Sequence, residues 1–166
     1  MLETPKSKLQ HYGYLHRGKD DPRPEILRLL KKYLGSKGSI VAYNAGFEID
    51  KIAKCCEVFP GYKAWFPQIQ ERIVDLLDPF KAFYYYHYKQ EGSASIKSVL
   101  PAITGKGYEG LTIADGGTAS SEYLRITFGD VREEERNKVR NSLEEYCGLD
   151  TEAMALIIAA LRKFVE

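Results

Sequence analysis

The stretch Ile40-Val41-Ala42-Tyr43-Asn44-Ala45-Gly46-Phe47-Glu48 contains the transition on which the predicted fold depends. A short apolar run, typical of a buried parallel strand, passes through Asn44 into a helix expected from about Phe47 to Cys56. Glu48 then lies in the first helical turn, next to the carboxyl end of the strand, where α/β proteins place ligand sites. A carboxylate there also suits the helix dipole without any further function. Asn44 suits either a turn or a metal-bound water, so both interpretations stay open.

Strands and helices alternate along the rest of the chain. We expect strands over Leu9–His16, Ser39–Tyr43 and Ile73–Leu77. The expected helices cover Asp20–Gly35, Tyr62–Glu71, Ser95–Leu100, Thr118–Phe128 and roughly the last forty residues, where Gly148 can introduce a break. This alternation predicts an α/β fold, and no linker is long enough to separate a second domain from residues 1–166.

The composition has no extreme feature. The 166 residues are 44% hydrophobic, enough for a core, and a net charge of +1 gives no global signature of nucleic-acid binding. Any such binding must therefore come from a local patch. Cys55, Cys56 and Cys147 lack zinc-type spacing and predict reduced thiols in a cytoplasmic protein. No apolar run approaches the roughly 20 residues of a membrane span, so no membrane partner is expected.

Tyr146 and Asp150 form a second candidate pair near the C-terminus. Residues four apart lie on one face of a helix, so these two side chains can point together. With Glu48 from another helix, Asp150 could complete a site for a hard metal ion, which prefers carboxylate oxygens. Each residue also has a simpler interpretation. Asp150 can cap a helix that begins at Thr151, just after Gly148, and Tyr146 can be a core tyrosine.

Asp75 interrupts the apolar run Ile73–Leu77 with a charge. A buried carboxylate must be paired or hydrogen-bonded. Asp75 therefore either supports the site around Glu48 or caps the next turn, and the sequence favours neither interpretation. Asp78, directly before Pro79, has the pattern of a turn residue.

A dense aromatic stretch, Phe83-Tyr84-Tyr85-Tyr86-His87-Tyr88, lies between Lys81 and Lys89. Aromatic rings stack on the bases of single strands, and neighbouring lysines favour phosphate. On this interpretation, the residues that contact nucleic acid are Phe47, Tyr85, His87 and Lys97. The alternative is that half of the rings pack on the core and half cover the surface.

These segments resemble a known family. The run Ile40–Glu48 is similar to the second motif of ribonuclease H-like 3′–5′ exonucleases, Asn-x-x-Phe-Asp, and Tyr146–Asp150 is similar to the YxxxD motif of their DEDDy subclass. Glu71–Phe80, Ser95–Pro101 and Asp115–Gly117 resemble a bacterial domain-of-unknown-function family of the DnaQ-like exonuclease group. The resemblance extends from about His11 to the end of the chain.

The resemblance implies a ribonuclease H-like sheet flanked by helices and a site with two Mg²⁺ or Mn²⁺ ions. Glu48 and Asp150 would be metal ligands, and Glu48 stands where the family motif usually has Asp. Tyr146 would orient the attacking water. Asn44 would be a supporting residue, as would Asp75.

The first motif of that superfamily, an Asp-x-Glu on a strand before Leu9–His16, has no counterpart, since Met1–Thr4 offers a Glu but no matching Asp. We therefore expect a fragment of a longer protein that lacks its first strand or strands and is nearly inactive. The expected full-length function is metal-dependent 3′–5′ exonuclease activity on single-stranded nucleic acid. The alternative is a non-catalytic ribonuclease H-like module that binds nucleic acid or protein. A missing strand would leave unpaired backbone, which predicts a homodimer or strand exchange.

Overall fold

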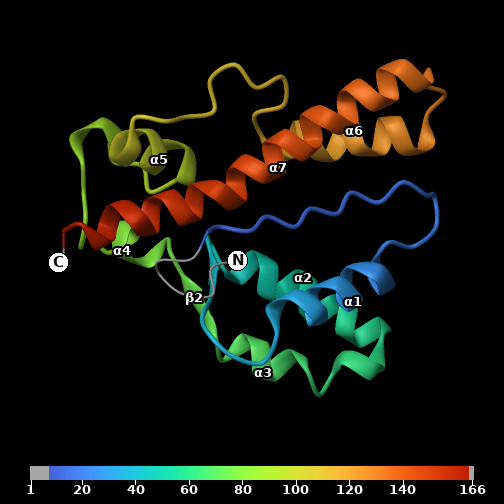
Figure 1. Ribbon diagram of the computed structural model, residues 1–166, viewed down its shortest axis with the longest axis horizontal. Helices are drawn as coiled ribbons and strands as arrows, with labels where there is room; N and C mark the ends of the chain where they lie inside the picture. The colour runs from blue at the N-terminus through green and yellow to red at the C-terminus, as the bar shows by residue number, and fades with distance from the viewer. Residues whose placement is uncertain (1–7, 165–166) are drawn as a thin grey trace. The chain divides into compact units, whose positions relative to one another are not determined.

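The computed structural model describes residues 8–164, so the remarks above on Met1–Thr4 lie outside the described residues. The chain divides into two compact units, which are described separately. Unit 1 is Met1–Lys19 with Tyr108–Thr151, and unit 2 is Asp20–Gly107 with Glu152–Glu166. Figure 1 gives the element labels used below. The prediction of one domain over residues 1–166 stays a prediction.

Unit 2 is built on a strand–helix–strand segment. Strand β1 (Ile40–Ala42) leads into helix α2 (Gly46–Val58), and strand β2 (Ile73–Asp75) follows after the short helices η1 (Pro60–Tyr62) and α3 (Phe66–Gln70). The strands pair in parallel with Ile40 opposite Ile73 and Ala42 opposite Asp75. Parallel strands need such a crossover connection, so α2 is the helix of a βαβ unit. The mixed α/β class is therefore confirmed, with a smaller sheet than predicted.

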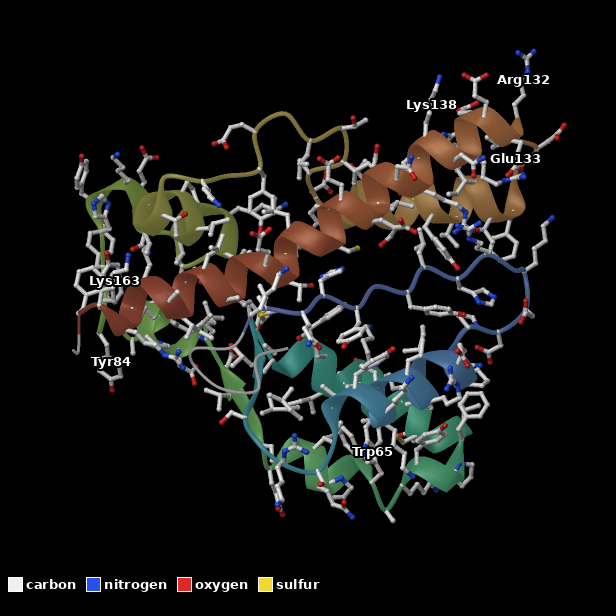
Figure 2. All side chains as sticks on the ribbon, viewed as in Figure 1. Trp65, Tyr84, Arg132, Glu133, Lys138 and Lys163 are labelled. Carbon is white, nitrogen blue, oxygen red and sulfur yellow. The ribbon has the colours of Figure 1, made fainter. Side chains whose placement is uncertain are left out.

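The core of unit 2 packs helices against one another beside this sheet. Helix α1 (Arg23–Leu34) places Leu27 against Cys56 of α2 and against Trp65 and Ile69, all of which are buried. Figure 2 labels Trp65 in this part of the molecule. Leu27 and Ile69 are almost fully removed from water, and burial of such side chains contributes about 1.5–3 kcal/mol each. This core holds α2, and therefore the turn before it, in place.

Arg72 fixes the loop between α1 and β1. Its guanidinium donates to the backbone carbonyls of Leu34, Gly35, Lys37 and Gly38 at 2.7–2.9 Å. The carbonyl of Arg72 also accepts the Ile40 N–H, which starts the parallel ladder. The end of α1 would otherwise leave carbonyls without partners, so the side chain of Arg72 caps this helix while its backbone carbonyl joins the ladder.

The remainder of unit 2 is made of short helices. After β2, helix α4 (Asp78–Lys81) precedes the aromatic stretch, and η2 (Tyr88–Gln90) follows it. Helix α5 (Ile96–Thr104) begins where the Ser95 hydroxyl accepts the Lys97 N–H, as predicted from the Ser pattern.

Unit 1 contains helix α6 (Gly116–Phe128) and most of helix α7 (Glu133–Arg162), which contributes its last residues to unit 2. Asp115 begins α6, because its carboxylate accepts the N–H and hydroxyl of Thr118. The core of unit 1 contains Ile113, Ile126, Leu143 and Tyr146.

Several predictions of local structure were wrong. Leu9–His16 is not a strand, because an alternating pattern favours extended backbone, whereas a strand also needs a hydrogen-bonded partner. Gly148 does not interrupt α7. One glycine destabilises a helix interior by about 1 kcal/mol relative to alanine, which is too little to break a long helix. Asp150 is consequently no N-cap. Asp78 is the first residue of α4 rather than a simple turn residue. In residues 8–164, no helix is long and apolar enough to cross a membrane.

Candidate functional site

The turn between β1 and α2 is formed by Asn44 and Ala45. Asn44 adopts a left-handed backbone with φ of 63°, a conformation that Asn tolerates better than most residues. Its carbonyl accepts the Phe47 N–H at 3.0 Å, which closes the first turn of α2. The predicted Asx-type bond is not present in the described residues, so Asn44 serves the turn through its backbone conformation. Its side chain is exposed.

Asp75 closes this turn from the neighbouring strand. Its Oδ1 accepts the N–H of Asn44 at 2.8 Å and of Leu77 at 3.0 Å, and its Oδ2 accepts the N–H of Ala45 at 2.9 Å. Asp75 therefore caps the next turn and also holds the segment that leads to Glu48, while its support of a site around Glu48 stays a prediction. Because both oxygens are occupied by backbone donors, this carboxylate acts as a structural anchor.

The first turn of α2 presents two exposed side chains. Phe47 is 59% exposed, so its ring lies outside the core. The Lys51 ammonium lies 4.8 Å from the centre of the Phe47 ring. Glu48 is exposed and makes no hydrogen bond or ion pair with the described residues. The βα turn thus directs one carboxylate and one aromatic ring to solvent at the carboxyl end of β1.

Asp150 lies in unit 1, half-buried within α7. Its Oδ1 accepts the hydroxyl hydrogen of Tyr108 at 2.7 Å, from the loop before α6. Tyr108 and Tyr146 place their ring centres 6.4 Å apart. Tyr146 is buried one turn before Asp150, so the predicted pair does share one face of one helix. No ion pair neutralises Asp150 within residues 8–164.

The phenol of Tyr146 is held in its neutral form. Burial, followed by the negative charge of Asp150 and the hydrogen bond with its carboxylate, raises the pKa of Tyr146 to about 12. Asp115 contributes in the same direction with a smaller effect. Tyr146 is therefore a hydroxyl donor at neutral pH, which is the form that can orient a water or a phosphate oxygen.

Tyr108 is the residue that the sequence did not identify. It lies in a glycine-flanked loop, 42 positions from Asp150, and no periodicity or motif joins the two. Asp115 was recognised as part of a resembling segment, but its proximity to Tyr146 was not. Neither partner carries a local signal, because the contacts are set by tertiary packing.

The predicted nucleic-acid contacts in unit 2 have mixed placements. Tyr85 is half-buried, with its ring centre 5.9 Å from that of Phe80 and 5.3 Å from that of Phe164. His87 is the N-cap of η2, and its Nδ1 accepts the Lys89 N–H at 3.3 Å. Lys97 is half-buried in the first turn of α5. These contacts are structural, and the most exposed rings of the stretch belong to other positions.

Carboxylate oxygens such as those of Glu48 and Asp150 suit Mg²⁺ or Mn²⁺ in donor type. Within residues 8–164, no group of three or more His, Cys, Asp or Glu side chains is placed to hold a metal ion. Glu48 belongs to unit 2 and Asp150 to unit 1. The described residues thus supply suitable donors, but fewer than a complete two-metal site needs. Cys55, Cys56 and Cys147 are free cysteines.

The fold and these residues define a mixed α/β protein with carboxylates at a strand–helix turn and on a long helix. The chain belongs to the family described as a domain of unknown function, DUF2779, whose model matches residues 1–95. That match includes Asn44, Glu48 and Asp75 and ends before Tyr146 and Asp150. No curated protein and no solved structure matches the chain. Nothing in these matches names an exonuclease.

Proposed function

We propose that this chain is part of a metal-dependent 3′–5′ exonuclease that acts on single-stranded nucleic acid, with a ribonuclease H-like fold. The observation that supports this function best is the environment of Asp150. This half-buried carboxylate receives a phenol hydroxyl from Tyr108 but has no cationic partner within the described residues. A carboxylate removed from water favours a nearby positive charge, which a divalent ion would provide.

Each residue then has a defined task. In two-metal sites the ions activate a water and stabilise the leaving oxygen. Asp150 in unit 1 and Glu48 in unit 2 would each bind a metal ion, and Tyr146 would donate its hydroxyl to orient the water. Asp75 and Asn44 would position Glu48 without contacting the metal, because they hold the turn from which Glu48 projects.

The test is a nuclease assay on 5′-labelled single-stranded DNA and RNA with Mn²⁺, using the natural full-length polypeptide. We expect Asp150→Ala to lower the rate at least 100-fold, since removal of one metal ligand disrupts positioning and charge stabilisation. Asp130→Ala is the matched control, because Asp130 is an exposed carboxylate with no contacts in the described residues. Equal rates for Asp150→Ala and the wild type would overturn the assignment.

A second pair of variants tests Glu48 on its own helix. Glu48→Gln should weaken Mn²⁺ binding, measured by calorimetry or by electron paramagnetic resonance, at least tenfold. Glu57→Gln, an exposed residue further along α2, should leave Mn²⁺ binding unchanged. Because this readout needs no turnover, it separates metal binding from the chemical step.

The alternative function is a non-catalytic module that binds nucleic acid or protein. The exposed rings of the aromatic stretch favour this alternative, because such rings can bind without any metal. The same assay decides between the two functions: retention of the labelled strand with no Mn²⁺-dependent cleavage supports the binding module.

The homodimer or strand exchange also remains a proposal. In residues 8–164 the sheet consists of β1 and β2, so each strand has one edge without a paired strand, and such an edge can accept a strand from another chain. Light scattering at rising concentration tests this idea. A monomer at all concentrations would contradict it.

A further inference from the structure

The segment from Phe83 to Tyr88 exposes most of its aromatic surface. The exposed fractions are 67% for Phe83, 86% for Tyr84, 48% for Tyr86 and 73% for Tyr88. Figure 2 shows the side chain of Tyr84 extending away from the ribbon. Tyr85, the one half-buried tyrosine, anchors the segment against Phe80. Four of these six consecutive residues thus expose large rings, which a solvated loop does not need, and the ring centres of Phe83 and Tyr86 lie 5.8 Å apart.

The backbone conformation of Phe83 is unusual for a residue with a large side chain. Phe83 has φ of 57°, a left-handed conformation that favours glycine. It ends α4 in a Schellman motif, in which the Phe83 N–H bonds the Phe80 carbonyl and the Tyr84 N–H bonds the Pro79 carbonyl. Glycine at this position would avoid about 1 kcal/mol of strain. Folding alone therefore does not account for an exposed phenylalanine here.

The charge around the rings is positive. Lys81 and Lys89 are exposed and form no ion pair with the described residues, and the sequence between Asp78 and Glu91 contains no carboxylate. Lys163 adds a further positive charge beside Phe164, whose ring contacts Tyr85. Rings flanked by unpaired lysines complement bases and phosphates, whereas an apolar protein partner would not need the lysines.

We infer that Phe83, Tyr84, Tyr86 and Tyr88 form a stacking surface for single-stranded nucleic acid, with Lys81 and Lys89 contacting its phosphates. This surface lies wholly within unit 2 and uses none of the carboxylates assigned to the metals. The inference deepens the proposed function by adding a binding surface for its single-stranded substrate. It does not require hydrolysis, because stacking and phosphate contacts operate without divalent ions.

The test is fluorescence anisotropy of labelled 12-nucleotide oligo-dT and oligo-U with the whole chain, in EDTA and at low salt. The variant Tyr84→Ala/Tyr86→Ala/Tyr88→Ala should bind at least tenfold more weakly, since each stacked base contributes about 1–3 kcal/mol. Tyr12→Ala/Tyr14→Ala, which removes two exposed rings of unit 1, should bind within twofold of the wild type. No binding by the wild type, or unchanged binding by the triple variant, would overturn the inference.

Two further variants exclude loss of folding and locate the phosphates. Phe83→Gly should raise the denaturation midpoint while it weakens binding severalfold, so the lost affinity cannot come from unfolding. Lys81→Gln/Lys89→Gln should lower the slope of log K against log salt by about 1.4, as expected for two phosphate contacts on a single strand. An unchanged slope would contradict these lysine contacts.

The outcomes also separate this inference from the proposed nuclease. Binding in EDTA without Mn²⁺-dependent cleavage would support the stacking surface and contradict the nuclease. Mn²⁺-dependent cleavage together with unchanged binding by the triple variant would support the nuclease and contradict the stacking surface. If the wild type binds no oligonucleotide but dimerises in sedimentation, and the triple variant is monomeric, the face contacts protein and the inference is wrong.

Discussion

The carboxyl end of β2 and the centre of α7 each hold a half-buried carboxylate, but the donors that surround them differ. Asp75 receives three backbone N–H groups and closes a local turn. Asp150 receives a tyrosine hydroxyl from Tyr108 and lies beside the neutral phenol of Tyr146. Backbone donors cannot leave without disturbing the fold, whereas hydroxyl donors can rotate to other acceptors. The same residue type therefore supports structure in one place and is available for chemistry in the other.

The largest expected effect is on Asp75. We expect Asp75→Asn to lower the free energy of unfolding of unit 2 by about 3 kcal/mol, since the amide keeps one acceptor and turns its NH₂ toward a backbone donor. The only tryptophan, Trp65, is buried in the unit 2 core, so its fluorescence during urea denaturation reports on this unit.

The control for this variant is Asp78→Asn. Asp78 is exposed at the start of α4, so its loss should cost at most about 0.5 kcal/mol through the helix dipole. If Asp75→Asn and Asp78→Asn shift the Trp65 midpoint equally, the carboxylate of Asp75 is not the structural anchor that its contacts indicate.

The next effect concerns the pH dependence of unit 1. The folded pKa of Tyr146, about 12, exceeds the ordinary value of 10.0, so stability from its neutral phenol is present below pH 10 and lost as pH rises toward 12. The loss should reach about 2 kcal/mol across this interval. Tyr146→Phe has no phenol to ionise, so its stability should fall less steeply over the same pH range. Far-UV circular dichroism at graded urea measures the difference.

The half-buried Tyr123 supplies the control for this titration. Tyr123→Phe removes the hydroxyl of another tyrosine that packs against the same core. A Tyr146→Phe profile that superimposes on that of Tyr123→Phe would mean that Asp150 and burial do not hold Tyr146 neutral.

Much of the fold near β1 follows from local sequence. The apolar run at Ile40–Ala42, the amphipathic pattern of α2 and the Ser95 cap all act over a few residues, and each predicted element formed. The segment Leu9–His16 shows the limit of such local reasoning. Its alternation predicted a strand that did not form, because strand formation depends on a distant partner that no local pattern specifies.

The residues of the candidate site also separate into those with a local sequence signal and those that depend on tertiary contacts. Glu48 and the Tyr146–Asp150 pair were recognisable because the turn signal and the i, i+4 spacing are local. Tyr108 was not, since its bond to Asp150 joins a loop to a helix across 42 positions. The two roles weighed for Asp75 could not be separated by sequence, because they depend on which backbone donors the parallel register brings to its oxygens.

The smallest expected effect on the free energy of unfolding comes from the Asp→Asn substitution in α7. This variant compares Asp150 directly with Asp75. Asp150→Asn should cost less than about 1 kcal/mol, because the amide oxygen still accepts the Tyr108 hydroxyl. Loss of the negative charge should also lower the pKa of Tyr146, which is followed by ultraviolet titration of tyrosine. Tyr108→Phe is the companion variant, since it removes the donor and keeps the charge. If Asp150→Asn destabilises unit 1 as strongly as Asp75→Asn destabilises unit 2, then Asp150 is also a structural anchor, and the argument that it is available to a metal ion fails.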